Sequence, residues 1–106
     1  MPRLLCLLLA VLPCLPAGAG PLGAAREQEL RNLLLQDCGS CHGMRLTGGL
    51  GPALTPAALA GKPRELLLAA IRDGRDGTPM PPWKPLLGED EIAWLVDYLL
   101  QGEPAP

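Results

Sequence analysis

The chain has 106 residues, with 9 Lys or Arg, 11 Asp or Glu and one His, which give a net charge of −2 at pH 7. This length allows one small domain, and the weakly acidic balance excludes the basic surface that nucleic-acid-binding proteins need. Phe is absent, and only Trp83, Trp94 and Tyr98 are aromatic. With so few large rings, we expect a flat apolar group other than a side chain to fill the centre of the domain.

Residues 1–19 have the pattern of a secretory signal peptide. Arg3 supplies the positive start, Leu4–Leu15 the apolar run, and Ala17-Gly18-Ala19 the small residues of a cleavage site. The apolar run is shorter than the about 20 residues that span a bilayer, so we expect no stable membrane insertion. Lipid attachment at Cys14 and an uncleaved anchor are the alternatives, and the proline before Cys14 disfavours the first.

Cleavage after Ala19 would leave residues 20–106 as a single exported domain, which we expect to be a periplasmic monomer. Two of the four cysteines would leave with the signal peptide, so Cys38 and Cys41 alone would remain. Two remaining thiols argue against a scaffold held together by disulfides. The net charge would change only to −3, because the removed segment carries one Arg.

The domain is predicted to be all-α, because its apolar residues recur at helical spacing. The first predicted helix covers residues 24–37, with Leu30, Leu33 and Leu34 on its buried side. The polar side of this helix carries Arg26, Glu27, Glu29 and Arg31. The helix leads directly into Cys38.

Three further helices follow. The glycine-rich segment 43–54 is predicted to be a loop, after which Thr55 caps a short helix from Pro56 to Ala60. The next predicted helix starts at Pro63 and stops at Gly74. Its expected buried residues are Leu66, Leu67, Ala70 and Ile71.

Prolines and glycines make residues 74–88 a loop, and the last predicted helix runs from Glu89 to about Gln101. Its first turn has three carboxylates, which the helix dipole favours there. Its expected buried residues are Ile92, Leu95, Val96 and Leu99. Residues 103–106 are expected to form a frayed tail.

The segment Cys38-Gly-Ser-Cys41-His42 constrains the chemistry most strongly, because C-x-x-C-H is the attachment pattern of c-type haem. Two thiols three positions apart can each bond to one vinyl group of the same porphyrin, and the imidazole that follows can reach the iron. His42 is the single histidine of the chain, so no other imidazole competes. A thioredoxin-like dithiol would need a βαβ context, and a zinc site would need further Cys or His ligands. We therefore expect one haem c, bound covalently through Cys38 and Cys41.

The sixth ligand of the iron decides the function of such a protein. Met80 lies between Pro79 and Pro81 on a stiff stretch, which favours it as the ligand opposite His42. Met44 follows His42 too closely to reach the other side of the ring. Coordination by His42 and Met80 fills both axial positions and suits electron transfer rather than catalysis.

Two residues are candidates for supporting roles around the haem. The carbonyl of Pro52 is expected to accept a hydrogen bond from the second imidazole nitrogen, and so to orient His42. The alternative for Pro52 is an ordinary turn proline. Trp83 is expected either to donate its indole N–H to a haem propionate or to cover the ring edge.

These motifs together resemble the class I cytochromes c over nearly all of residues 20–106. The resemblance implies a small all-α fold wrapped around one haem, in which the first and last helices cross. That family packs an aromatic residue of the last helix against a glycine of the first. Tyr98 matches the aromatic residue, whereas Leu30 occupies the position of the glycine.

Met80-Pro-Pro-Trp83 and the loop Gly48–Pro56 are similar to a narrower group, the small periplasmic monohaem cytochromes encoded beside the haem c/haem d nitrite reductases of denitrifying bacteria. This resemblance implies no enzymatic activity but single-electron exchange with nitrite reductase, or a part in maturing its haem d. The alternatives are a generic shuttle for another periplasmic reductase or oxidase, and a haem-based ligand sensor if Met80 does not bind iron.

Overall fold

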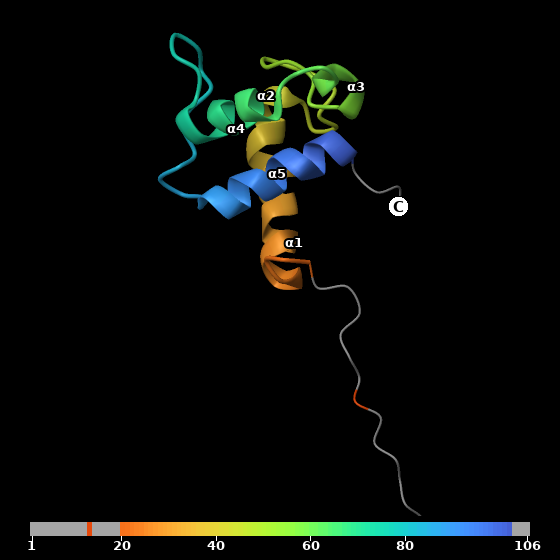
Figure 1. Ribbon diagram of the computed structural model, residues 1–106. Coiled ribbons are helices and arrows are strands. Elements are labelled where there is room, and N and C mark those ends of the chain that lie inside the picture. The colour runs from red at the N-terminus through yellow and green to blue at the C-terminus, as the bar shows by residue number, and fades with distance from the viewer. Residues whose placement is uncertain (1–12, 14–19, 103–106) are drawn as a thin grey trace, which may run out of the picture.

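The computed structural model describes Pro13 and residues 20–102, and the elements of this part are all helical (Figure 1). In chain order they are α1 Ala24–Leu33, the π-helical turn η1 Leu34–Cys38, α2 Gly39–His42, α3 Pro56–Leu59, α4 Arg64–Asp73 and α5 Glu89–Gln101. The all-α prediction is confirmed. Within the described part, no helix is both long and apolar enough to cross a membrane. The predicted signal peptide, apart from Pro13, and the predicted tail lie outside the described residues.

The first three elements form one continuous helical rod that extends further than predicted. The helix does not stop before Cys38 but continues through the C-x-x-C-H segment to His42, after which Gly43 turns the chain at φ 92°. The turn between α1 and α2 is π-helical, because the Gly39 N–H bonds to the carbonyl of Leu34, five residues earlier. The Ser40 hydroxyl donates to the carbonyl of Asp37 at 2.7 Å, which gives a partner to a carbonyl in this irregular turn.

Helix α5 crosses the rod, as Figure 1 shows, and the core forms at the crossing. Leu30 and Leu34 of the rod are almost completely buried there. The four residues predicted as the buried face of α5, Ile92, Leu95, Val96 and Leu99, are all buried. Tyr98 stacks on Trp94, with ring centroids 5.0 Å apart, on the flank of the same helix.

The buried face of α4 agrees with the prediction in part, since Leu67 and Ile71 pack against the core as expected. Leu66, expected inside, is 51% exposed, whereas Leu68 is buried and is 8% exposed. Arg64, in the first turn of α4, forms an exposed ion pair with α5, in which its Nε lies 2.8 Å from the Asp97 carboxylate. Leu68 is one helical turn beyond Arg64 and therefore lies on the same side. At the start of α3, the Thr55 hydroxyl accepts a hydrogen bond from Ala58 N–H at 3.2 Å, so the predicted cap is confirmed.

The position of Glu27 also differs from the prediction, which placed it on the polar side of the first helix. It is buried, because residues 20–23 turn back toward it. The Gly23 N–H bonds to the carbonyl of Gly20 at 3.0 Å, and the Leu22 N–H points to the Glu27 carboxylate at 3.5 Å. A helical pattern alone does not reveal a segment that folds back over the helix.

An ion pair between Arg26 and Glu91 joins α1 to α5. The Arg26 guanidinium and then the Gly88 N–H hold the pKa of Glu91 below its usual value. A lowered carboxylate pKa adds stability that is complete above the unfolded pKa, near 4.5, and is lost as the pH falls through the folded pKa.

Glu91→Gln should therefore lower the melting temperature by a few degrees at pH 7, since a partly exposed pair contributes up to about 1 kcal/mol. It should also weaken the pH dependence of stability below about pH 5. Thermal unfolding between pH 3 and 7 measures both effects. Asp90→Asn removes a charge from the same helical turn and serves as the control, because Asp90 is in none of the ion pairs of the described residues. An equal effect in the two variants would contradict the role of the Arg26 pair.

Candidate functional site

The two thiols of the C-x-x-C-H segment lie at the end of the rod. Cys38 ends η1, Cys41 lies in α2, and both are half-buried free thiols. Burial, assisted by the neighbouring Asp37 carboxylate, raises the pKa of the Cys38 thiol to about 11. The Cys38 sulfur therefore stays protonated at neutral pH, in the S–H form whose addition across a vinyl group yields a thioether.

His42 ends the same helix, and its imidazole is held by the following loop. Its Nδ1 lies 2.7 Å from the carbonyl oxygen of Pro52. Because a carbonyl can only accept, Nδ1 carries the proton and donates it to this bond. The neutral imidazole then keeps the lone pair of Nε2 for a metal, the usual arrangement of a metal-binding histidine.

The loop is closed onto the end of α2 by glycine backbone. Gly51 N–H donates to the carbonyl of Cys41, and Gly48 N–H to the carbonyl of His42, both at 2.8 Å. These bonds satisfy carbonyls that the end of a helix leaves unpaired. A Cβ on Gly51 would lie 2.7 Å from both Cε1 and Nδ1 of the imidazole. Gly51 is thus a site residue whose individual role the sequence did not reveal, although its place after the C-x-x-C-H segment was visible.

Gly51→Ala should displace the imidazole or the loop, because the contact is too short for a methyl group. Overpacking of this kind typically costs about 1–3 kcal/mol, which predicts a clear fall in melting temperature. It should also change the electron paramagnetic resonance spectrum of the oxidised protein, which reports on the orientation of an axial ligand.

Gly39→Ala provides the matched control, since its Cβ would meet no atom closer than 3.5 Å. Gly51→Ala with a wild-type spectrum and stability would mean that the imidazole does not depend on this close contact.

Met80 is half-buried in the connection between α4 and α5, and the backbone on both sides is fixed. Its N–H donates to the Thr78 hydroxyl at 3.3 Å, and its carbonyl accepts from Arg75 N–H at 3.2 Å. Gly74 permits this turn, because a Cβ there would lie 2.6 Å from the Met80 carbonyl oxygen. Trp83 anchors the segment after Met80. Its backbone N–H bonds to the carbonyl of Ile71 at 2.9 Å, and its side chain packs against the core.

The candidate residues thus form two groups held by separate segments. One group comprises Cys38, Cys41, His42 and Pro52, at the end of the rod and its loop; the other comprises Met80 and Trp83. Two thiols, an imidazole with a free Nε2 and a thioether are the donors that a covalently attached haem requires, so this set fits haem c. A zinc site at these cysteines has less support, since the described residues hold no group of three or more His, Cys, Asp or Glu suited to a metal ion.

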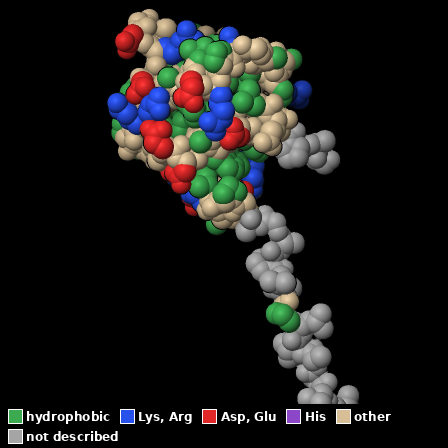
Figure 2. Space-filling view, in the orientation of Figure 1, with side chains coloured by type: hydrophobic (Ala, Val, Ile, Leu, Met, Phe, Trp, Pro, Cys, Tyr) green, Lys and Arg blue, Asp and Glu red, His purple; other side chains and the backbone are tan. Residues whose placement is uncertain are grey.

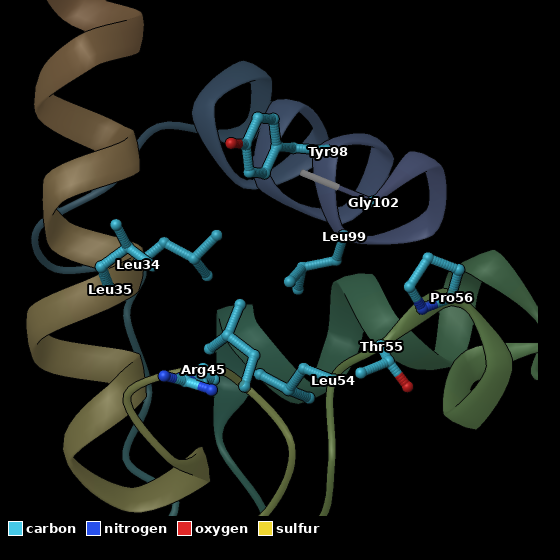
Figure 3. A pocket seen from close by; sticks show the side chains of 10 residues that line it. Leu34, Leu35, Arg45, Leu54, Thr55, Pro56, Tyr98, Leu99 and Gly102 are labelled. Carbon is cyan, nitrogen blue, oxygen red and sulfur yellow. The ribbon is translucent and has the colours of Figure 1, made fainter. Parts of the chain in front are cut away.

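A pocket of about 80 Å³ lies between η1, the end of α5 and the loop that precedes α3 (Figure 3). Leucines dominate its lining, and Arg45, Thr55 and Tyr98 add polar atoms. None of the predicted haem residues lines it. It is smaller than the roughly 300–1,000 Å³ of typical small-molecule sites, so this pocket does not itself hold a porphyrin.

Known proteins similar to this chain are cytochromes. A family model described as "Cytochrome C oxidase, cbb3-type, subunit III" matches residues 25–99. Cytochrome c55X of Pseudomonas aeruginosa is 69% identical over 78% of this chain and 70% of its own length. Cytochrome c55X of Paracoccus denitrificans is 58% identical over 91% of this chain and 93% of its own length.

Solved structures agree with these relatives. The c-type cytochrome NirC is 67% identical, with a TM-score of 0.75, over 78% of this chain and 98% of that structure. The dihydro-heme d1 dehydrogenase NirN, solved in complex with DHE, is 33% identical with a TM-score of 0.65, but the match covers only 16% of that larger protein. The fold is therefore that of the class I cytochromes c, as predicted. The chain belongs to the c-type cytochrome family that this model describes and that includes the cytochrome c55X proteins.

Proposed function

We propose that this protein is a periplasmic carrier of single electrons with one haem c and no substrate chemistry of its own. Cys38 and Cys41 hold the haem, and His42 and Met80 ligate its iron. When bound, haem supplies the one-electron Fe(III)/Fe(II) couple. The observation that carries the proposal is the 2.7 Å bond from His42 Nδ1 to Pro52, because it fixes the imidazole and leaves Nε2 free at the end of the helix that presents both thiols.

Each remaining residue of the site has a defined task in this proposal. Pro52 and Gly51 keep the imidazole in one orientation, and a fixed ligand lowers the structural change that accompanies each electron transfer. The hydrogen bonds of Met80 fix the backbone from which its thioether would reach the iron. A protein with both axial positions filled leaves none for a substrate, which favours a carrier over an enzyme.

The nitrite reductase system is the partner we propose. Support comes from the 67% identity to the c-type cytochrome NirC and from the similarity to part of NirN, which is named a dihydro-heme d1 dehydrogenase. The carrier then passes electrons to nitrite reductase, or accepts them while haem d matures. It acts as a monomer in either role, since a shuttle meets its partners by brief collisions.

We place the docking surface at the loop that follows His42 and at the connection between α4 and α5 that carries Met80. They expose large apolar side chains: Leu50 is 78% exposed, Met44 65%, and Leu86 71%. Elsewhere, positive and negative side chains lie interspersed on the face in Figure 2, and several of them are paired, such as Arg64 with Asp97 and Arg72 with Glu89. Mixed charge gives little long-range attraction, so association should depend weakly on salt.

Stopped-flow mixing of the reduced protein with oxidised haem c/haem d nitrite reductase tests this proposal. We expect rapid electron transfer whose rate changes only a few-fold between low and physiological salt. Leu50→Ser should slow transfer several-fold, because it removes apolar contact at the proposed surface.

Leu66→Ser changes an exposed leucine of α4 and should leave the rate unaltered. If the wild type transfers no electrons to a reductase that accepts them from other donors, the nitrite reductase role is wrong. A generic shuttle for another periplasmic reductase or oxidase would then be the better interpretation.

A further inference from the structure

Glu27 is the one charged residue among the described residues that is buried, with 8% of its surface exposed. The two basic residues of its helix are engaged elsewhere: Arg26 pairs with Glu29 and Glu91, and Arg31 bonds to Gln28 and lies over Trp94. Within residues 20–102, no Lys or Arg pairs with the Glu27 carboxylate. Its hydrogen-bond donor is the Leu22 N–H at 3.5 Å. A buried carboxylate so weakly compensated is costly unless a cation reaches it.

The backbone of Gly20 lies against this carboxylate. A Cβ on Gly20 would lie 2.6 Å from both Cδ and Oε2 of Glu27, and closer still to Oε1. Adding one carbon–carbon bond puts the Gly20 Cα within about 4 Å of Oε2, and its nitrogen is one further bond away. The turn between Gly20 and Gly23 fixes this position at the start of α1.

Gly20 is also the residue that would begin the chain after cleavage at the small-residue pattern Ala17-Gly18-Ala19. Hydrolysis of the Ala19–Gly20 peptide bond consumes one water and leaves a carboxylate on Ala19 and an amine on Gly20. An α-amine has a pKa of about 8, so it is mostly protonated at neutral pH. Processing would thus create a cation at the end of the chain that is already beside Glu27.

We propose that the new α-ammonium of Gly20 forms an ion pair with the buried Glu27 carboxylate and fastens residues 20–23 to α1. The pair forms only in the processed chain, because before cleavage the Gly20 nitrogen is a neutral amide. The absence of a side chain at Gly20 is what allows the amine to approach the carboxylate. Removal of the signal peptide therefore stabilises the exported domain as well as releasing it.

The test compares two exported holoproteins, one that begins at Gly20 and one that retains Ala19 behind a heterologous signal peptide. Mass spectrometry verifies both ends, and urea unfolding gives the folding equilibrium constants. We expect the additional alanine to lower the constant about tenfold, which corresponds to about 1.4 kcal/mol. In the Glu27→Gln variant, the additional alanine should change the folding equilibrium constant less than twofold. In Glu29→Gln, which removes an exposed carboxylate of the same helix, the tenfold effect should persist.

Equal stability of the wild-type forms that begin at Ala19 and at Gly20 would contradict the proposed ion pair. A tenfold effect that persists in the Glu27→Gln variant would contradict it as well. A chain that the cell processes at another bond would overturn it as well. If Glu27→Gln does not fold, acetylation of the two wild-type forms by acetic anhydride decides the matter. The amine of the Gly20 form should react at least fivefold more slowly, and equal rates would contradict the proposal.

Discussion

Replacing both Cys38 and Cys41 by Ala should abolish covalent haem attachment completely. The two half-buried thiols are the free cysteines of the described structure, so the double variant leaves no sulfur there for a thioether. Acid–organic extraction should then remove all haem from the variant and none from the wild type, when both are exported together with haem-attachment machinery. Because the apolar core is small, the variant should also lose most of its helical fold.

Ser40→Ala is the control for this experiment, since it changes one of the two residues between the cysteines but neither thiol. It loses only the hydroxyl bond to the Asp37 carbonyl and should keep its haem. Haem that resists extraction in the double variant would show that attachment does not use these cysteines.

Met80→Ala should open the sixth coordination position of the iron. The oxidised variant should lose the weak near-infrared band of sulfur–iron coordination and bind cyanide or imidazole rapidly, whereas the wild type binds them slowly. Its reduction potential should fall, because a thioether favours the ferrous state. Axial ligation spans about 0.8 V of haem potential, so we expect a decrease on the order of 0.1 V.

Met44→Ala is the matched control, because Met44 is 65% exposed and follows the opposite axial ligand. Its spectrum, ligand-binding rate and potential should equal those of the wild type. If Met80→Ala retains the band, or if Met44→Ala loses it, the sixth ligand is not Met80. A wild type that binds external ligands at once would instead favour the ligand sensor.

The parts of the fold with strong local signals were predictable from the sequence. Helix α5 begins at its acidic first turn and ends at Gln101, as predicted, and its buried face follows the helical period. Thr55 likewise caps α3 as expected, because the preference depends on one side chain and the next turn of backbone. The C-x-x-C-H segment carries its own chemistry and needs no tertiary context to be recognised.

The remaining features depend on contacts between distant segments. The burial of Leu68 rather than Leu66 depends on how α4 packs against α5, where Arg64 meets Asp97, 33 residues away, and a periodic pattern cannot show such a contact. The π-helical turn inserts a residue into an otherwise regular repeat, and the burial of Glu27 depends on residues 20–23 turning back. Gly51 gains its importance only because its loop returns to the imidazole of His42.

The intact mass of the exported protein under denaturing conditions shows whether one haem is covalently bound to this chain. Denaturation removes every haem held by ligation alone, so a remaining haem must be bonded to the polypeptide. We expect a single mass equal to residues 20–106 plus one haem, with the added mass on the fragment that contains Cys38 and Cys41. The mass of the polypeptide alone, with haem released into the solvent, would contradict it.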